Sequence, residues 1–258
     1  MSKFNYDISE HILKAIAKSI SDGIGVDFIH SKKQLDTFTN NSTPSMIWDL
    51  INTNCNKNLG NNFVCQLIKR KRGMWEFLLI YDKNSKKLIS VMRESRLKQI
   101  LKHPQKYKKH YVAALAQFLN EGLKSSQKKL FNLPKTEDEK KYLSELSKEL
   151  CEDINSISIS DSLYAILSFG SLNGQMSSYS STFLTQNLEL CKEESLQRYI
   201  PKDYDMVVNT ETPNEIEDIP LTLKPAALKK KQAKKKKISD IVEVKTIQVC
   251  DKIEQNEE

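Results

Sequence analysis

The sequence predicts an α+β protein, with an antiparallel meander and an Asn-Gly hairpin packed against helices, and with a disordered lysine-rich C-terminal tail. Three observations predict this class. Isoleucines recur at four-residue steps near the N-terminus, which is typical of a helix. Apolar and polar residues alternate between 63 and 94, which indicates strands. Asn173-Gly174 separates two apolar runs and suits a two-residue hairpin turn, because both turn residues need positive φ.

Two helices are expected first. Ile8, Ile12, Ile16 and Ile20 lie on one helical face, and Gly23 and Gly25 should end that helix. The second helix should begin at Thr43-Pro44, because proline fits the first helical turn. The asparagine-rich stretch 52–62 should then form a loop.

A three-stranded meander should follow, with strands at 63–70, 75–82 and 88–94. Helices are expected next, at 95–102, about 106–129 and 136–154. The last of these has a capping box, Thr136 with Glu139. Residues 163–172 and 175–184 should pair as a hairpin around Asn173-Gly174, and a short helix is expected at about 192–199.

Length and composition predict one globular domain. The chain has 258 residues, 39% of them hydrophobic, which is enough for a sizeable core. We expect this domain to span 1–212, with a sub-boundary near 132–136, and a flexible lysine-rich tail at 213–258, which has too few apolar residues to fold.

The apolar runs fall short of the roughly 20 residues that cross a bilayer, and the N-terminal residues lack the apolar core of a secretory signal. We therefore expect no membrane insertion. Five cysteines are scattered singly, without a C-x-x-C pair. They predict reduced thiols and a cytoplasmic protein.

Positive charge is concentrated in one part of the chain. Residues 69–109 hold fourteen Lys or Arg and three acids, a net charge of +11, whereas the whole chain carries +7. A folded segment with this charge density attracts polyanions or an acidic protein surface. Lysines with interleaved aromatic side chains are typical of surfaces that bind nucleic acid.

Non-enzymatic binding of nucleic acid, DNA or RNA, is therefore the function that the sequence favours. The alternative partner is an acidic protein that the chain would grip as an inhibitor or adaptor. The expected binding residues are the cations of the basic segment, one tryptophan and the tail lysines: Lys69, Arg70, Lys71, Arg72, Trp75, Arg93, Arg96, Lys98, Lys102, Lys106, Lys108, Lys109, Lys229, Lys230, Lys231, Lys234, Lys235, Lys236 and Lys237.

A second alternative is a metal-dependent nuclease. Asp82 and Glu94-Ser95-Arg96 resemble a degenerate PD-(D/E)XK arrangement, in which such acids hold a divalent metal. A turn at Asn84-Ser85 would place Asp82 opposite Leu88, and Glu94 opposite Glu76, so the last two would form the acid pair. The sequence has no glycine-rich phosphate loop. We expect no catalytic residue, metal or cofactor, and no enzymatic activity.

Overall fold

The computed structural model describes residues 4–35, 39, 41–125, 135–152, 159 and 161–202. The chain up to Lys202 forms one compact unit. The expected tail and its boundary at 212 lie outside the described residues. The sub-boundary near 132–136 stays a prediction.

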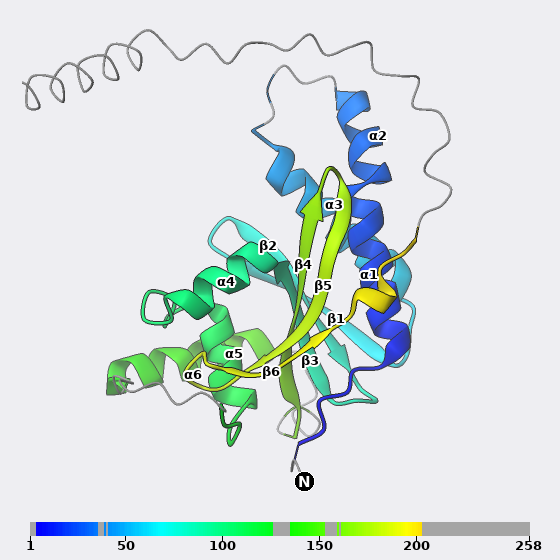
Figure 1. Ribbon diagram of the computed structural model, residues 1–258. Helices are drawn as coiled ribbons and strands as arrows, with labels where there is room; N and C mark the ends of the chain where they lie inside the picture. Colours follow the sequence, from blue (N-terminus) through cyan, green and yellow to red (C-terminus); the bar gives the residue numbers. More distant parts are fainter. Residues whose placement is uncertain are drawn as a thin grey trace, which may run out of the picture. The chain divides into compact units, whose positions relative to one another are not determined.

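Six strands form one sheet in chain order, which confirms the α+β class (Figure 1). Neighbouring strands are antiparallel, except that β3 and β4 are parallel. The strands are β1 (Cys65–Arg72), β2 (Trp75–Asp82), β3 (Lys87–Arg93), β4 (Leu163–Leu172), β5 (Gln175–Leu184) and β6 (Leu190–Ser195). The expected meander and Asn-Gly hairpin thus belong to the same sheet.

Helices cover both faces of the sheet. On one face, α1 (Glu10–Ile24) and α3 (Thr43–Leu59) pack against Ile80, Ile89 and Ala165. On the other face, α4 (Glu94–Lys102), α5 (Tyr111–Leu119) and α6 (Glu137–Cys151) pack against Leu79, Leu88 and Tyr164. Neighbouring residues of a central strand therefore face different cores, as expected for strands covered on both sides.

The remaining helices are smaller contributors to the core. The helix α2 (Val26–Leu35) contacts α1 and α3 but buries none of its side chains. A 3₁₀ turn at Gln197–Tyr199 follows β6.

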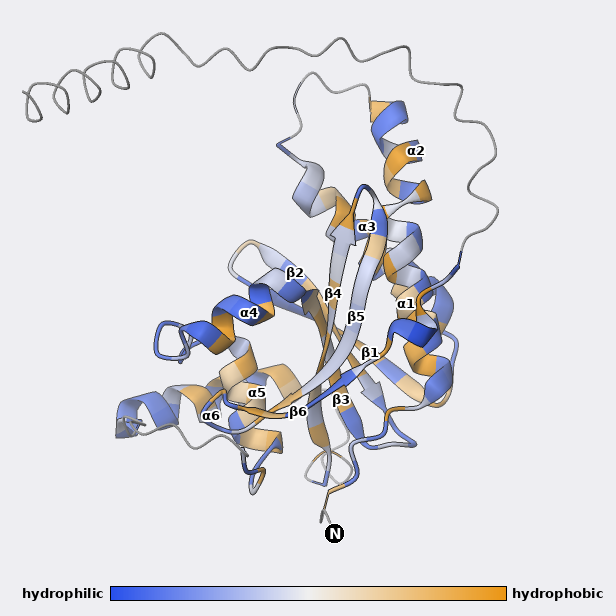
Figure 2. Cartoon of the chain, viewed as in Figure 1, coloured by the Kyte–Doolittle hydropathy of each residue, from blue (hydrophilic) through white to orange (hydrophobic). Residues whose placement is uncertain are grey.

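Figure 2 shows hydrophilic residues along most of α4, although its Leu97 and Ile100 are buried. None of the described helices combines the length and the apolar composition of a membrane span.

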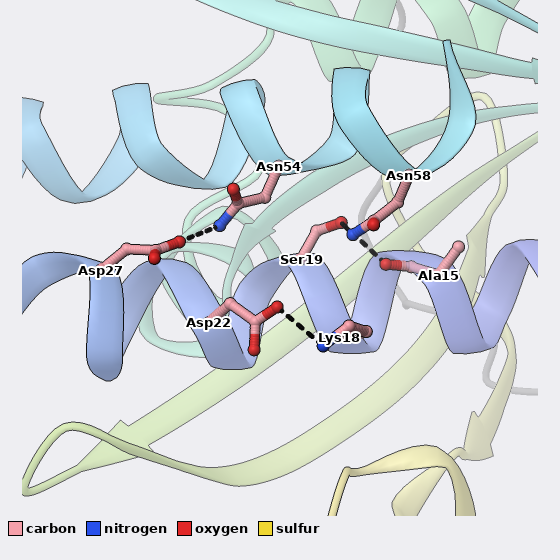
Figure 3. Close-up of polar contacts among 7 residues, drawn as sticks. All are labelled: Ala15, Lys18, Ser19, Asp22, Asp27, Asn54 and Asn58. Atoms are coloured by element: carbon pink, nitrogen blue, oxygen red, sulfur yellow. Dashed lines mark hydrogen bonds and ion pairs between the residues drawn. The ribbon is translucent and has the colours of Figure 1, made fainter. Parts of the chain in front are cut away.

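The expected loop at 52–62 is wrong, because α3 continues to Leu59. Its asparagines find partners on the neighbouring helices: Asn54 donates to Asp27 Oδ2 at 2.6 Å, and Asn58 donates to Ser19 Oγ at 2.8 Å (Figure 3). The same helix buries Cys55 and Leu59. These contacts offset the weak helix propensity of asparagine.

Two other boundaries also differ from expectation. The first helix passes Gly23 and ends at Ile24, and Gly25 separates it from α2. Within the stretch expected as one helix at 106–129, only Tyr111–Leu119 is helical among the described residues. The capping box of Thr136 and Glu139 is confirmed.

The hairpin prediction is confirmed with both strands in full, and Asn173 and Gly174 have φ of 51° and 74°. The helix expected at 192–199 is wrong up to Ser195, where β6 pairs with β5, and only the 3₁₀ turn Gln197–Tyr199 lies within the expected range. Lys192, Glu193 and Glu194 belong to β6, which is an edge strand of the sheet. Charged side chains on an edge strand disfavour pairing with another chain.

Gly23 tests the packing of α1 on α3. A Cβ at this position would lie 2.8 Å from Cγ1 of Ile51 and 2.9 Å from its backbone nitrogen. Helix propensity alone predicts that Gly23→Ala stabilises the protein by about 1 kcal/mol. We expect the opposite, a loss of about 1–3 kcal/mol, because the backbone of α3 must move. Urea unfolding measures the change, with Lys57→Ala on the exposed side of α3 as the control; a stabilised Gly23→Ala variant would contradict the packing.

Candidate nucleic-acid interface

The sheet divides between β2 and β3. The β1–β2 ladder continues to Arg72↔Trp75, and the β3–β4 ladder continues to Arg93↔Phe169. Between them, the β2–β3 ladder covers only Asp82↔Lys87 to Leu79↔Ser90. Beyond this point β2 stays with β1 and β3 stays with β4, so the sheet opens at one end.

A pocket of about 400 Å³ occupies this opening, and we name it the sheet-split pocket. Its volume lies within the range of roughly 300–1,000 Å³ that is usual for small-molecule sites. Its aromatic lining comes from three elements: Trp75 and Phe77 from β2, Trp48 from α3, and Tyr111 from α5. Because α3 and α5 cover opposite faces of the sheet, side chains from both layers meet in the pocket.

The aromatic rings are held in defined contacts. Trp48 lies edge-on to Trp75, with ring centres 6.3 Å apart, and edge-on to Phe169 at 5.8 Å. Phe77 stacks on Tyr111 at 4.6 Å. Trp75 remains 43% exposed, so an aromatic face at the end of the β1–β2 hairpin is open to solvent.

Two arginines supply the positive charge of the pocket. The Arg93 guanidinium lies 5.9 Å from the ring centre of Phe169. Arg96 lies 4.6 Å from the ring centre of Tyr107 and donates to its hydroxyl at 3.2 Å. Neither arginine pairs with a carboxylate among the described residues, and the described lining contains no Asp or Glu. The pocket therefore favours an anionic ligand.

His110 adds polarity to the pocket without adding charge. Its Nδ1 accepts a hydrogen bond from the backbone nitrogen of Val112 at 3.3 Å. Burial, and then the charges of Arg96 and Arg72, lower the pKa of His110 to about 4. The imidazole is thus neutral near pH 7, with its proton on Nε2.

The structure divides the predicted binding residues into groups. Three of them are in ion pairs: Lys69 with Glu76 at 2.7 Å, Lys98 with Glu94, and Lys108 with Glu139. Arg70 donates from Nε to the carbonyl oxygen of Leu150 at 2.9 Å. Seven other predicted binding residues are cations that form no ion pair with a carboxylate in the described part of the chain, and we name them the basic face: Lys71, Arg72, Arg93, Arg96, Lys102, Lys106 and Lys109. The tail lysines lie outside the described residues.

Sequence reasoning included Trp75, Arg93 and Arg96 but missed the other side chains of the pocket. Trp48 lies on α3, a helix that packs on one face of the sheet, whereas Trp75 lies on the strand β2. No local sequence pattern therefore connects the two tryptophans. Ser95, Gln99 and His110 also line the pocket. The one available signal was composition, since the chain has two tryptophans and both lie here.

The expected pairing of Glu76 with Glu94 is wrong. Asp82 lies opposite Lys87 instead of Leu88, and the β2–β3 ladder ends before it reaches Glu76. Glu94 belongs to the first turn of α4, where it pairs with Lys98 and accepts a hydrogen bond from Ser178. Within the described part of the chain, no group of three His, Cys, Asp or Glu side chains could hold a metal ion.

The side chain of Asp82 stabilises the fold through hydrogen bonds. Its carboxylate accepts hydrogen bonds from the backbone nitrogens of Ser9 and Asn84, both at 3.1 Å, and from the Ser85 hydroxyl. Burial raises the pKa of Asp82, but the hydrogen bonds from Ser85 and Ser9 outweigh burial and leave it below its ordinary value. These contacts fix the β2–β3 turn to the start of α1.

The chain belongs to a family of unknown function, DUF5986, whose model matches residues 2–244. The region of the match includes every element of the sheet and the whole lining of the sheet-split pocket. Searches of curated proteins and of solved structures found no match.

The neutral state of His110 predicts a pH dependence of stability. Its pKa is about 4 in the folded protein, against an ordinary value of 6.5 that the unfolded chain retains. Between these values the unfolded state binds a proton that the folded state does not, so stability falls as the pH falls from 6.5 to 4. This penalty reaches about 3 kcal/mol below pH 4 and is absent above pH 6.5.

His110→Asn keeps a capping acceptor for Val112 and removes the titrating group. We expect the free energy of unfolding of the variant, relative to the parent, to rise by about 3 kcal/mol between pH 7 and pH 4. Urea unfolding at both pH values measures it, and His30→Asn controls for removal of an exposed imidazole. A difference between variant and parent that stays constant with pH would contradict the neutral His110.

Proposed function

We propose that the protein binds nucleic acid, without catalysing a reaction, through the basic face. The observation that carries the proposal is the position of the cations without a carboxylate partner. They lie on the elements that border the sheet-split pocket, namely the end of the β1–β2 hairpin, the end of β3, α4 and residues 103–110. Figure 1 shows this hairpin end beside α4.

Several contacts hold these segments together. Arg72 donates to the Tyr142 hydroxyl at 2.9 Å, and the Lys109 Nζ lies 5.7 Å from the centre of the same ring. Arg72 and Arg96 both lower the pKa of His110, so the end of the hairpin and α4 both lie near this side chain. Arg72, Arg96 and Lys109 therefore lie near one another, although they come from β1, α4 and the segment that follows α4.

A surface of this kind has a direct physical use. Cations without carboxylate partners repel one another, and a polyanion relieves that repulsion while it releases its condensed counterions. Contacts to phosphates give affinity without sequence preference. Aromatic rings beside the cations add stacking surfaces for unpaired bases. We propose that the tail lysines add phosphate contacts, and that the protein works in the cytoplasm.

An acidic protein is the second candidate partner. Met74 is 99% exposed and Trp75 is 43% exposed at the end of the β1–β2 hairpin. Exposed apolar anchors surrounded by charge are typical of protein interfaces. No described feature favours the nuclease alternative in the same way.

A salt series tests nucleic-acid binding. Labelled single-stranded DNA, single-stranded RNA and a duplex of the same length are titrated with the full chain, and fluorescence anisotropy gives each Kd. We expect log K to fall linearly with log salt, with a slope that corresponds to several phosphates. Affinity that is independent of salt, or no binding at low salt, would reject the proposal and leave the acidic protein partner.

The end of the hairpin should contribute to binding more than to folding. We expect Lys71→Ala with Arg72→Ala to weaken binding by about 1–3 kcal/mol and to reduce the salt slope. The free energy of unfolding should fall by less, about 1 kcal/mol, because the hydrogen bond from Arg72 to Tyr142 is lost. The matched control is Lys32→Ala with Lys33→Ala, which removes the same charge from exposed positions on α2. Equal losses of affinity in both double variants would indicate a net-charge effect instead of a binding surface.

A further inference from the structure

We infer that the sheet-split pocket binds one unpaired nucleobase and that Arg93 and Arg96 contact the phosphate of the same nucleotide. The inference rests on the proposed function, because it names the part of a nucleic acid that the pocket takes. It adds to that function a preference for single strands, which the cations of the basic face alone would not provide.

The shape of the pocket follows from the division of the sheet. Beyond the pair Leu79↔Ser90, β2 and β3 are no longer paired, and a gap opens between them. Its walls are the rings of Trp48, Trp75 and Phe77 with Tyr111. Bases stack on such rings with little regard to sequence, since every base has a π-face. A space between aromatic walls therefore suits a flat ring.

The charges of the pocket select the ligand further. Its lining holds two arginines that lack a carboxylate partner, and no described acid. Arginine binds a phosphate with two parallel hydrogen bonds. The Ser95 hydroxyl, the Gln99 amide and the Nε2–H of His110 provide neutral hydrogen-bonding groups for the edge of a base. A flat ring joined to an anion meets all of these requirements.

Size and surroundings favour a nucleotide within a strand. A volume of about 400 Å³ lies in the lower part of the range for small ligands. Lys71 and Arg72 lie on the hairpin side of the pocket, and Lys102, Lys106 and Lys109 follow along α4 and the next segment. These cations lie outside the pocket, where neighbouring phosphates of a strand would meet them. A base within a duplex would have to leave its stack first, at a cost in free energy.

The two tryptophans of the chain both line the pocket, so the intrinsic tryptophan fluorescence of the full chain reports on this site. The probes are two single-stranded oligomers of abasic deoxyribose phosphate with equal length, one of which carries a single central thymine. They present the same phosphates and differ by one base. We expect the thymine probe to bind about 5- to 100-fold more tightly and to change the fluorescence, whereas the abasic probe binds without that change.

Variants then locate the effect. Trp75→Ala should lower the affinity for the thymine probe to that for the abasic probe and leave the abasic affinity unchanged. Phe118→Ala is the matched control, because Phe118 is 44% exposed and lies outside the pocket. It should behave like the parent chain. Circular dichroism confirms that both variants are folded.

The outcomes separate this inference from the proposed function. Equal affinity for both probes, without a fluorescence change, would overturn the base pocket and leave binding through the basic face intact. No binding of either probe at low salt would overturn both. A third arm uses free thymidine monophosphate. If it binds as tightly as the thymine probe, the pocket takes a free nucleotide, and the contribution of neighbouring phosphates is rejected.

Discussion

The strand pairing of β3 determines where the sheet opens and where the sheet-split pocket forms. Along its whole length β3 pairs in parallel with β4, whereas its antiparallel partner β2 leaves it after Ser90. A parallel pair requires a long crossover connection, and here α4, α5 and α6 supply it and cover one face of the sheet. The two-stranded β1–β2 ribbon is free to twist away, because two-stranded ribbons twist more than wide sheets. The sheet-split pocket is the space that this divergence leaves.

The same divergence organises the charges. It places the hairpin end, with Lys71 and Arg72, next to the start of α4, with Arg96. Acids neutralise part of the basic segment, through the pairs Lys69–Glu76, Lys98–Glu94 and Lys108–Glu139. The cations nearest the pocket keep no such partner among the described residues, and the histidine between them is neutral. Positive charge without a carboxylate partner therefore lies beside Trp75, whose side chain is 43% exposed.

Errors in the sequence predictions have a common cause, which is that local propensity ignores partners supplied by the fold. Asn54 and Asn58 continue a helix because Asp27 of α2 and Ser19 of α1 accept hydrogen bonds from them. Residues 190–195 form a strand because β5 offers an unpaired edge. The Glu76 and Glu94 pairing failed because a regular hairpin was assumed beyond the point where β2 and β3 separate.

The sequence by itself determined the α+β class, the complete β4–β5 hairpin, the capping box of α6 and the concentration of cations in one segment. Each of these depends on neighbours within a few residues: positive φ at Asn173-Gly174, a side chain three residues from its cap, or charge counted along the chain. The tertiary structure alone decided which cations keep no carboxylate partner and which rings surround Arg93. Trp48 and Trp75 meet only because the sheet opens between β2 and β3, and that opening depends on strand pairing between residues far apart in the chain.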